Sequence, residues 1–154
     1  MSSLSSTSPA IRSLPPAVLA LAEAHAAHAA PLLRTYADLA HAAAWTQLDV
    51  LDFAPAGSSG AVDTGANSGF AVVRGLRPER TKREVVVPCR IENTLSSAHF
   101  TMLFDALDRL SDGPSSDGEA LAPTERAHLL LAMLSPDGTV VYYTLARGIV
   151  KPVN

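Results

Sequence analysis

Two strongly β-forming runs near the end of the chain restrict the fold more than any other feature. Residues 128–134 read HLLLAML and residues 139–145 read TVVYYTL, and Ser-Pro-Asp-Gly at 135–138 separates them. Proline at the second position and glycine at the fourth position are typical of a type I turn. We therefore predict that the two runs form an antiparallel β-hairpin.

The second run of this hairpin is apolar on both faces. In a strand, Val140 and Tyr142 point to one side of the sheet, and Val141 and Tyr143 point to the other. Such a strand has to be covered on both sides. The cover is either the remainder of its own domain, as for a central strand, or a second polypeptide that packs on it.

The rest of the sequence predicts two helices, three strands and a third helix before the hairpin. Paired prolines at 15–16 open a helical run over 17–30, Pro31 restarts or kinks it, and a second helix follows over 32–44. β-branched residues predict strands within 45–54, 70–75 and 83–91, and a stripe of leucine and phenylalanine predicts a helix over 94–110. Pro88 indicates that its strand lies at an edge or ends there. This order predicts an α/β fold with a small mixed, largely antiparallel sheet flanked by helices.

Length and composition agree with one domain inside the cell. The 154 residues are 47% hydrophobic, carry a formal net charge of −3 and include one cysteine. We expect a disordered tail over 1–14 and one domain over 15–154, with flexible loops at 55–69 and 111–123. Without a signal peptide or a long apolar run, we expect no membrane insertion.

The basic residues are concentrated in one short window. Five of the twelve lysines and arginines lie within ten residues, namely Arg74, Arg77, Arg80, Lys82 and Arg83. This window is a candidate contact for RNA phosphates or for an acidic partner surface. No aromatic residue is interleaved to stack on bases, and Glu79 and Glu84 reduce the charge. A solvated turn therefore stays open as the third explanation.

The histidines and the cysteine indicate no cofactor and no metal. His25 and His28 are spaced to share a helical face, but no carboxylate or thiol stands at ligand spacing beside them. His99 and His128 are expected to be structural. Cys89 follows Pro88 in a strand and has no neighbouring base, so we expect a buried, inert thiol.

A family resemblance enters at the hairpin. The segment LLLAMLSPDGTVVYYTLARGIVKP, residues 129–152, resembles the end of the small non-catalytic subunit, subunit fifteen, of the eukaryotic tRNA-splicing endonuclease. The basic window, the strand after it and the helix at 94–110 fall in the expected order, so the resemblance covers about 32–152. The high alanine content of the chain is similar to that of fungal sequences. The implied fold is that of the C-terminal, nuclease-like domain of these subunits.

The resemblance implies an accessory subunit and not an enzyme. The complex removes introns from precursor tRNA without a metal, and its catalytic subunits carry a tyrosine, a histidine and a lysine. In this chain the tyrosine position falls near Val73, the histidine position lies within 80–84, and the lysine position lies within 126–128. The lysine region holds Arg126, Ala127 and His128, and none of the three positions carries a residue of the required type. We therefore predict that the catalytic set is absent.

The resemblance also implies how the subunit assembles. Its C-terminal strands would pack against a catalytic subunit within a heterotetramer that contacts precursor tRNA. The candidate interface residues are Leu131, Met133, Asp137, Val140, Val141, Tyr142, Tyr143, Leu145, Ile149 and Val150. Asp137 would supply an acidic turn that docks on a partner, with Asp112, Asp117 and Glu119 as substitutes.

Three further expectations complete the sequence-based account. The isolated chain should self-associate, because a bare apolar interface attracts a second copy. The complex should lie in the nucleus, with the cytosolic face of mitochondria as the alternative. Two other functions stay open: a small interaction module unrelated to splicing, or a nuclease with unrecognised chemistry at His99 or His128.

Overall fold

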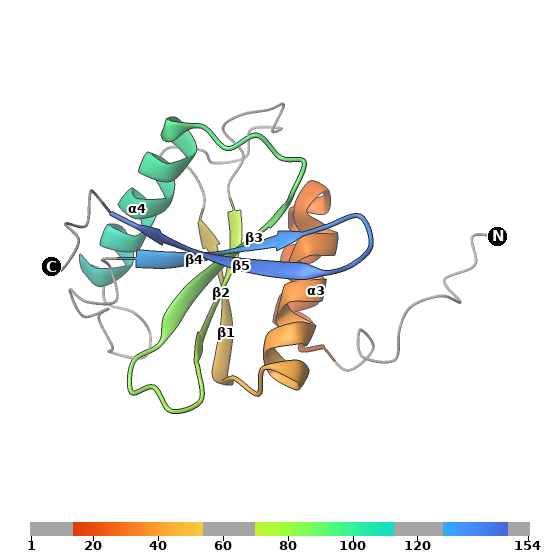
Figure 1. The fold of residues 1–154 in the computed structure, drawn as a ribbon. Helices are drawn as coiled ribbons and strands as arrows, with labels where there is room; N and C mark the ends of the chain where they lie inside the picture. Colours follow the sequence, from red (N-terminus) through yellow and green to blue (C-terminus); the bar gives the residue numbers. More distant parts are fainter. Residues whose placement is uncertain (1–13, 54–69, 113–127, 148–154) are drawn as a thin grey trace, which may run out of the picture.

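The computed structural model describes residues 14–53, 70–112 and 128–147, and it has the predicted α/β architecture. One five-stranded sheet is ordered β1-β2-β3-β4-β5, and helices cover both of its faces (Figure 1). The helical elements are α2 (Pro16–Ala24), the 3₁₀ turn η1 (Ala26–His28), α3 (Ala29–Ala37), the π-helical η2 (Asp38–Ala42) and α4 (Ser97–Asp112). The strands are β1 (Thr46–Phe53), β2 (Phe70–Leu76), β3 (Glu84–Arg90), β4 (His128–Leu134) and β5 (Val140–Ala146).

The sheet is mixed and largely antiparallel, as predicted. Neighbouring strands are antiparallel except for β3 and β4, which run parallel and are connected through the segment that contains α4. A parallel pair needs a long crossover, and the helix between these two strands meets that need. The predicted loop at 55–69 lies outside the described residues. Of the predicted tail over 1–14, only Leu14 is described, and it is buried. Of the predicted loop over 111–123, only residues 111–112 are described, and they belong to α4.

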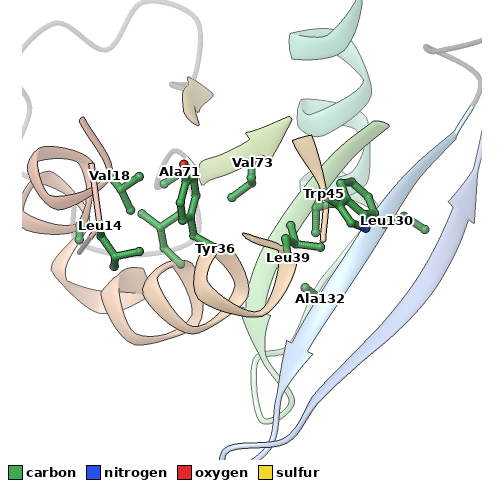
Figure 2. Close-up of a cluster of buried hydrophobic side chains, with 12 residues drawn as sticks. Leu14, Val18, Tyr36, Leu39, Trp45, Ala71, Val73, Leu130 and Ala132 are labelled. Carbon is green, nitrogen blue, oxygen red and sulfur yellow. The ribbon is translucent and has the colours of Figure 1, made fainter. Parts of the chain in front are cut away.

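Two apolar cores form because strand side chains alternate between the faces of the sheet. The first core lies between the sheet and helices α2 and α3, and Figure 2 shows Val73 and Leu130 of the strands facing Leu39 and Tyr36. The second core lies under α4. Its buried members are Phe53, Phe70, Val72, Val85, Val87, Leu103, Ala106, Leu107, Leu129 and Leu131.

The N-terminal helices differ from the prediction in where the chain breaks. The break falls at His25, whose φ of −119° and ψ of 64° end α2, and not at Pro31. Pro31 lies in the first turn of α3, where a missing N–H group costs nothing because that turn has no intrahelical acceptor. Val18 and Ala22 of α2 are buried, so this helix is docked on the domain.

The prediction that the strand of Pro88 lies at an edge or ends there was wrong, because β3 continues to Arg90 and pairs with β4 as far as that residue. β3 is the central strand, with β2 on one side and β4 on the other. Its ladder with β2 consists of the pairs from Glu84 to Val86, so Pro88 lies beyond it. A proline is tolerated there because no ladder bond to β2 requires its N–H group.

The C-terminal hairpin is confirmed. β4 and β5 pair from His128↔Ala146 to Leu134↔Val140. In the turn, the Gly138 N–H donates to the Ser135 carbonyl at 3.0 Å, and Gly138 has a φ of +88°, which glycine adopts without strain. Because β5 is the last strand in the order, one of its edges has no neighbouring strand among the described residues.

Candidate functional site

The inner face of β5 is covered by the chain's own helices. Val140 and Tyr142 pack against the first core, and the Tyr142 hydroxyl donates a 2.6 Å hydrogen bond to Asp38 Oδ2 in η2. Burial, followed by the bond to this carboxylate, raises the pKa of Tyr142 above its ordinary value. For these two residues the cover is therefore intramolecular.

The outer face of β5 is open. Val141 is 38% exposed and Tyr143 is 55% exposed, whereas Met133 and Leu145 on the same face are partly buried. We call these four side chains the outer apolar surface. Large aliphatic and aromatic groups this exposed on an edge strand make the surface a candidate for contact with a partner.

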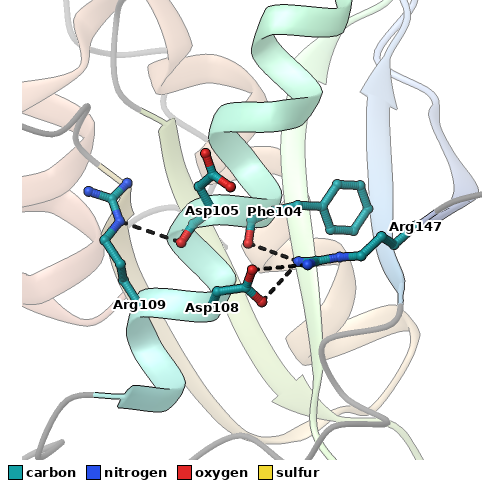
Figure 3. A network of polar contacts seen from close by, with 5 residues as sticks. All are labelled: Phe104, Asp105, Asp108, Arg109 and Arg147. Carbon is teal, nitrogen blue, oxygen red and sulfur yellow. Dashed lines mark hydrogen bonds and ion pairs between the residues drawn. The ribbon is translucent and has the colours of Figure 1, made fainter.

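The end of β5 is fixed to α4 beside this surface. Figure 3 shows the Arg147 guanidinium donating to both Asp108 carboxylate oxygens, at 2.9 and 3.0 Å, and to the Phe104 carbonyl at 3.0 Å. The same guanidinium lies 5.0 Å from the centre of the Phe104 ring. Between α4 and β5 runs an open groove of about 440 Å³, lined in part by Phe100 and Leu145. This groove continues the outer apolar surface toward α4.

The remaining predicted interface residues are distributed differently. Leu131 is buried under α4, so it supports the hairpin and is not a contact surface. Asp137 is exposed at the turn, where its carboxylate accepts from the Thr139 N–H at 3.0 Å, a bond that lowers the pKa of Asp137. Ile149 and Val150 lie outside the described residues.

Sequence reasoning missed the contribution of α4 to this site. It assigned Phe100 and Phe104 only to a core stripe, yet both are partly exposed beside β5. Their spacing of four residues was the available signal, because it places both rings on the same side of the helix. Arg147 carried no signal, because its partners Phe104 and Asp108 are about forty residues away in sequence.

The fold separates Arg74 from the other four basic residues of the window. Arg74 is buried opposite Asp49 on β1, and its Nε and Nη2 lie 3.1 and 2.5 Å from the two carboxylate oxygens. This bidentate ion pair commits Arg74 to the sheet, so it does not belong to an exposed basic surface.

The other four basic residues of the window line one cavity of about 360 Å³. Arg77, Arg80, Lys82 and Arg83 share its wall with Thr81, Glu84, His128 and Thr144, and we call this cavity the basic pocket. Glu84 lies between two pocket residues, with Oε2 3.0 Å from Arg77 Nε and Oε1 3.6 Å from His128 Nε2. Four cationic side chains therefore share the wall with one carboxylate, and Arg83 Nη1 also lies 3.8 Å from Asp49 Oδ2 of β1.

The positions that the resemblance assigns to catalysis lie in different surroundings. Val73 is fully buried in the first core, under α3, and does not reach the basic pocket wall. His128 stands in that wall beside Glu84. The absence of a catalytic set stays a prediction.

The histidines are held by local contacts. His25 Nε2 lies 2.9 Å from Asp52 Oδ1 of β1, and the His28 ring lies 5.6 Å from the Phe70 ring. They do not share one helix, because α2 ends before His25. His99 Nδ1 accepts from the Ser96 N–H at 3.0 Å. Among the described residues, no three histidine, cysteine, aspartate or glutamate side chains are grouped so that they could hold a metal ion.

Cys89 is fully buried, and burial raises its pKa to about 11. The raised value means that the thiol stays protonated through neutral and mildly alkaline pH, and the thiolate fraction at pH 8 is about one in a thousand. We expect iodoacetamide to leave native Cys89 unmodified at pH 8 and to alkylate it rapidly in denaturant, as mass spectrometry would show. Equal rates in both states would contradict this burial.

One protein family and one curated protein resemble the chain. The model of the family described as Sen15 protein matches residues 34–154, which include every strand. A Schizosaccharomyces pombe protein named "Probable tRNA-splicing endonuclease subunit sen15" is 30% identical over 73 residues, which make up 47% of this chain and 50% of that relative. The alignment thus spans about half the length of the curated relative.

Within the described residues, no helix is long and apolar enough to cross a membrane.

The family match covers well over half of the chain and contains both the outer apolar surface and the basic pocket. The chain therefore belongs to the Sen15 family.

Proposed function

We propose that this chain is a non-catalytic structural subunit of a tRNA-splicing endonuclease and that it pairs with a catalytic subunit through β5. Family membership and the name of the S. pombe relative support the assignment to this complex. The observation that carries the mode of pairing is the exposure of Val141 and Tyr143 on an edge strand whose other face is already covered.

Both the edge and the outer face of β5 are suited to a partner. Since no described strand neighbours the outer edge of β5, its backbone N–H and C=O groups can pair with a partner strand. The outer apolar surface and the groove beside α4 can be covered by the same partner. An obligate interface of this kind buries upward of about 2,000 Å².

The hairpin turn supplies a charged contact in this proposal. Hydrogen bonds from Thr139 lower the pKa of Asp137, so its carboxylate is ionised at neutral pH. A fixed negative charge at the tip of the hairpin can dock on a basic partner surface within a heterotetramer. Precursor tRNA is then cut by the catalytic subunits, and this chain holds them in position.

Affinity purification of the tagged full chain from its native cell tests the assignment. We expect the subunits of the tRNA-splicing endonuclease to copurify, and we expect the pure chain alone not to cleave precursor tRNA. Cleavage by the chain alone, or a purification without those subunits, would contradict the proposal. Fluorescence microscopy of the same tagged chain distinguishes the nuclear location that we propose from the mitochondrial surface.

We also propose that the isolated chain forms dimers, because the bare outer apolar surface of one copy can cover that of another. Size-exclusion chromatography with light scattering at tens of micromolar should give about twice the mass of the 16.1 kDa chain. The Val141→Asp variant should elute as a monomer, because dimerisation would bury its carboxylate unpaired. A monomeric wild-type chain under these conditions would argue against a self-complementary surface.

A further inference from the structure

We propose that the basic pocket binds a phosphodiester group of the RNA substrate, although the chain performs no chemistry there. This inference deepens the proposed function and rests on it, because the endonuclease would bring RNA to the chain. The pocket lies at the β2–β3 turn, the start of β4 and Thr144 of β5. Thr144 stands between Tyr143 and Leu145 in the strand, so its side chain points to the opposite face of the sheet. The pocket is therefore a second surface, distinct from the outer apolar surface.

The composition of the wall favours an anion. All eight lining residues are polar, and four of them are permanently cationic, against the single carboxylate of Glu84. Guanidinium groups match the geometry of phosphate oxygens, and the hydroxyls of Thr81 and Thr144 can donate further hydrogen bonds. The chain as a whole has a net charge of −3, so a positive pocket is a local feature and not a general property of its surface.

The contacts within the pocket hold part of the wall in place. Arg77 is fixed between Glu84, at 3.0 Å, and the ring of Trp45, at 5.4 Å from the ring centre. Glu84 Oε1 also lies 3.6 Å from His128 Nε2. An arginine held in position before binding loses less side-chain entropy when it meets a phosphate, so this arrangement favours binding over a freely moving turn.

The wall is typical of a phosphate contact and not of a protein–protein contact. Protein–protein interfaces are anchored by buried aromatic or aliphatic side chains, and no aliphatic residue, phenylalanine, tyrosine or tryptophan lines the pocket. Contacts to nucleic-acid phosphates come from arginine, lysine and hydroxyl groups, which make up most of this wall. No phenylalanine, tyrosine or tryptophan lines the pocket to stack on a base, so we expect binding that depends little on sequence.

The test uses the full chain and a fluorescein-labelled oligouridylate of about a dozen nucleotides, with fluorescence anisotropy measured over a range of potassium chloride concentrations. Arg80 is exposed, so the double variant Arg80→Ala, Lys82→Ala should fold normally. We expect it to bind roughly tenfold more weakly at low salt, and its slope of log K against log salt should fall by about 1.4, or 0.7 for each lost phosphate contact.

Arg90→Ala is the matched control, because Arg90 is exposed at the opposite end of β3, roughly 20 Å from Glu84 along the strand. It should leave both affinity and slope unchanged. Equal losses in Arg90→Ala and in the double variant would overturn the pocket as the site, and so would unchanged binding in the double variant.

Copurification with the endonuclease subunits separates this inference from the proposed function. The double variant should still copurify with them, and loss of the partner with unchanged RNA affinity would show that the pocket holds an acidic protein surface and would overturn the inference. The wild-type chain could capture no endonuclease subunit while the double variant still binds RNA more weakly than the wild type. In that case the proposed function fails and the phosphate pocket stands.

Discussion

Tyr143→Asp is expected to abolish copurification with the catalytic subunit while leaving the domain folded. The side chain is 55% exposed on the edge strand β5, so its replacement should change the free energy of unfolding by less than about 1 kcal/mol. In the complex the carboxylate would be buried without a partner, at a cost of several kcal/mol. A loss of about 4 kcal/mol weakens binding roughly a thousandfold.

Two further variants make the Tyr143 experiment specific. Val141→Asp tests the neighbouring exposed residue on the same face and should have the same effect. Thr46→Asp adds the same carboxylate at an exposed position of β1, the strand at the opposite edge of the sheet, and should copurify normally. Normal copurification of both Tyr143→Asp and Val141→Asp would show that the outer apolar surface is not the contact. Circular dichroism and thermal unfolding of each variant provide the check on folding.

Tyr142→Ala is expected to have the opposite signature, with a loss of stability of about 2–3 kcal/mol. The substitution removes a partly buried ring from the first core and leaves Asp38 Oδ2 without the 2.6 Å hydrogen bond that it accepts. Urea unfolding measures the change as a lower midpoint with an unchanged slope. A stability equal to that of the wild type would contradict the placement of Tyr142 against η2.

Tyr142→Phe separates the hydrogen bond from the packing of the ring. It keeps the aromatic contacts and removes only the hydroxyl, so we expect a loss of about 1 kcal/mol. Tyr143→Phe is its matched control, because Tyr143 is exposed and its hydroxyl makes no hydrogen bond with the described part of the chain. Its unfolding midpoint should be that of the wild type. The two adjacent tyrosines would then be separated by function, one for the fold and one for the partner.

Much of the fold follows from patterns within the sequence. The Ser-Pro-Asp-Gly turn at 135–138 predicted the hairpin, and the helical stripe that contains Leu103 and Leu107 predicted α4. Both signals are local, since a turn type and a helical period depend on residues that are close in sequence. The prediction from Pro88 failed because a proline is tolerated in a central strand wherever a ladder ends. The end of the ladder between β2 and β3 cannot be read from the residues next to Pro88.

The site itself depended on contacts that are distant in sequence. The alternation in β5 showed that both faces are apolar, but only the packing of Tyr142 on Asp38, 104 residues away, shows which face is already covered. Arg74 is the corresponding case in the basic window, because its commitment to Asp49 follows from the pairing of β1 with β2. Strand register and side-chain burial decide which face of β5 is covered and whether Arg74 is exposed. A sequence pattern specifies neither the register nor the burial.

Photo-crosslinking from position 143 tests the central claim most directly. With benzoylphenylalanine in place of Tyr143 in the full chain, irradiation of the native cell should produce a covalent adduct with a tRNA-splicing endonuclease subunit, identified by mass spectrometry. The same residue in place of Leu19, an exposed apolar side chain on α2, should produce no such adduct. An adduct from position 19 but none from position 143 would place the partner on the helical face and contradict the account.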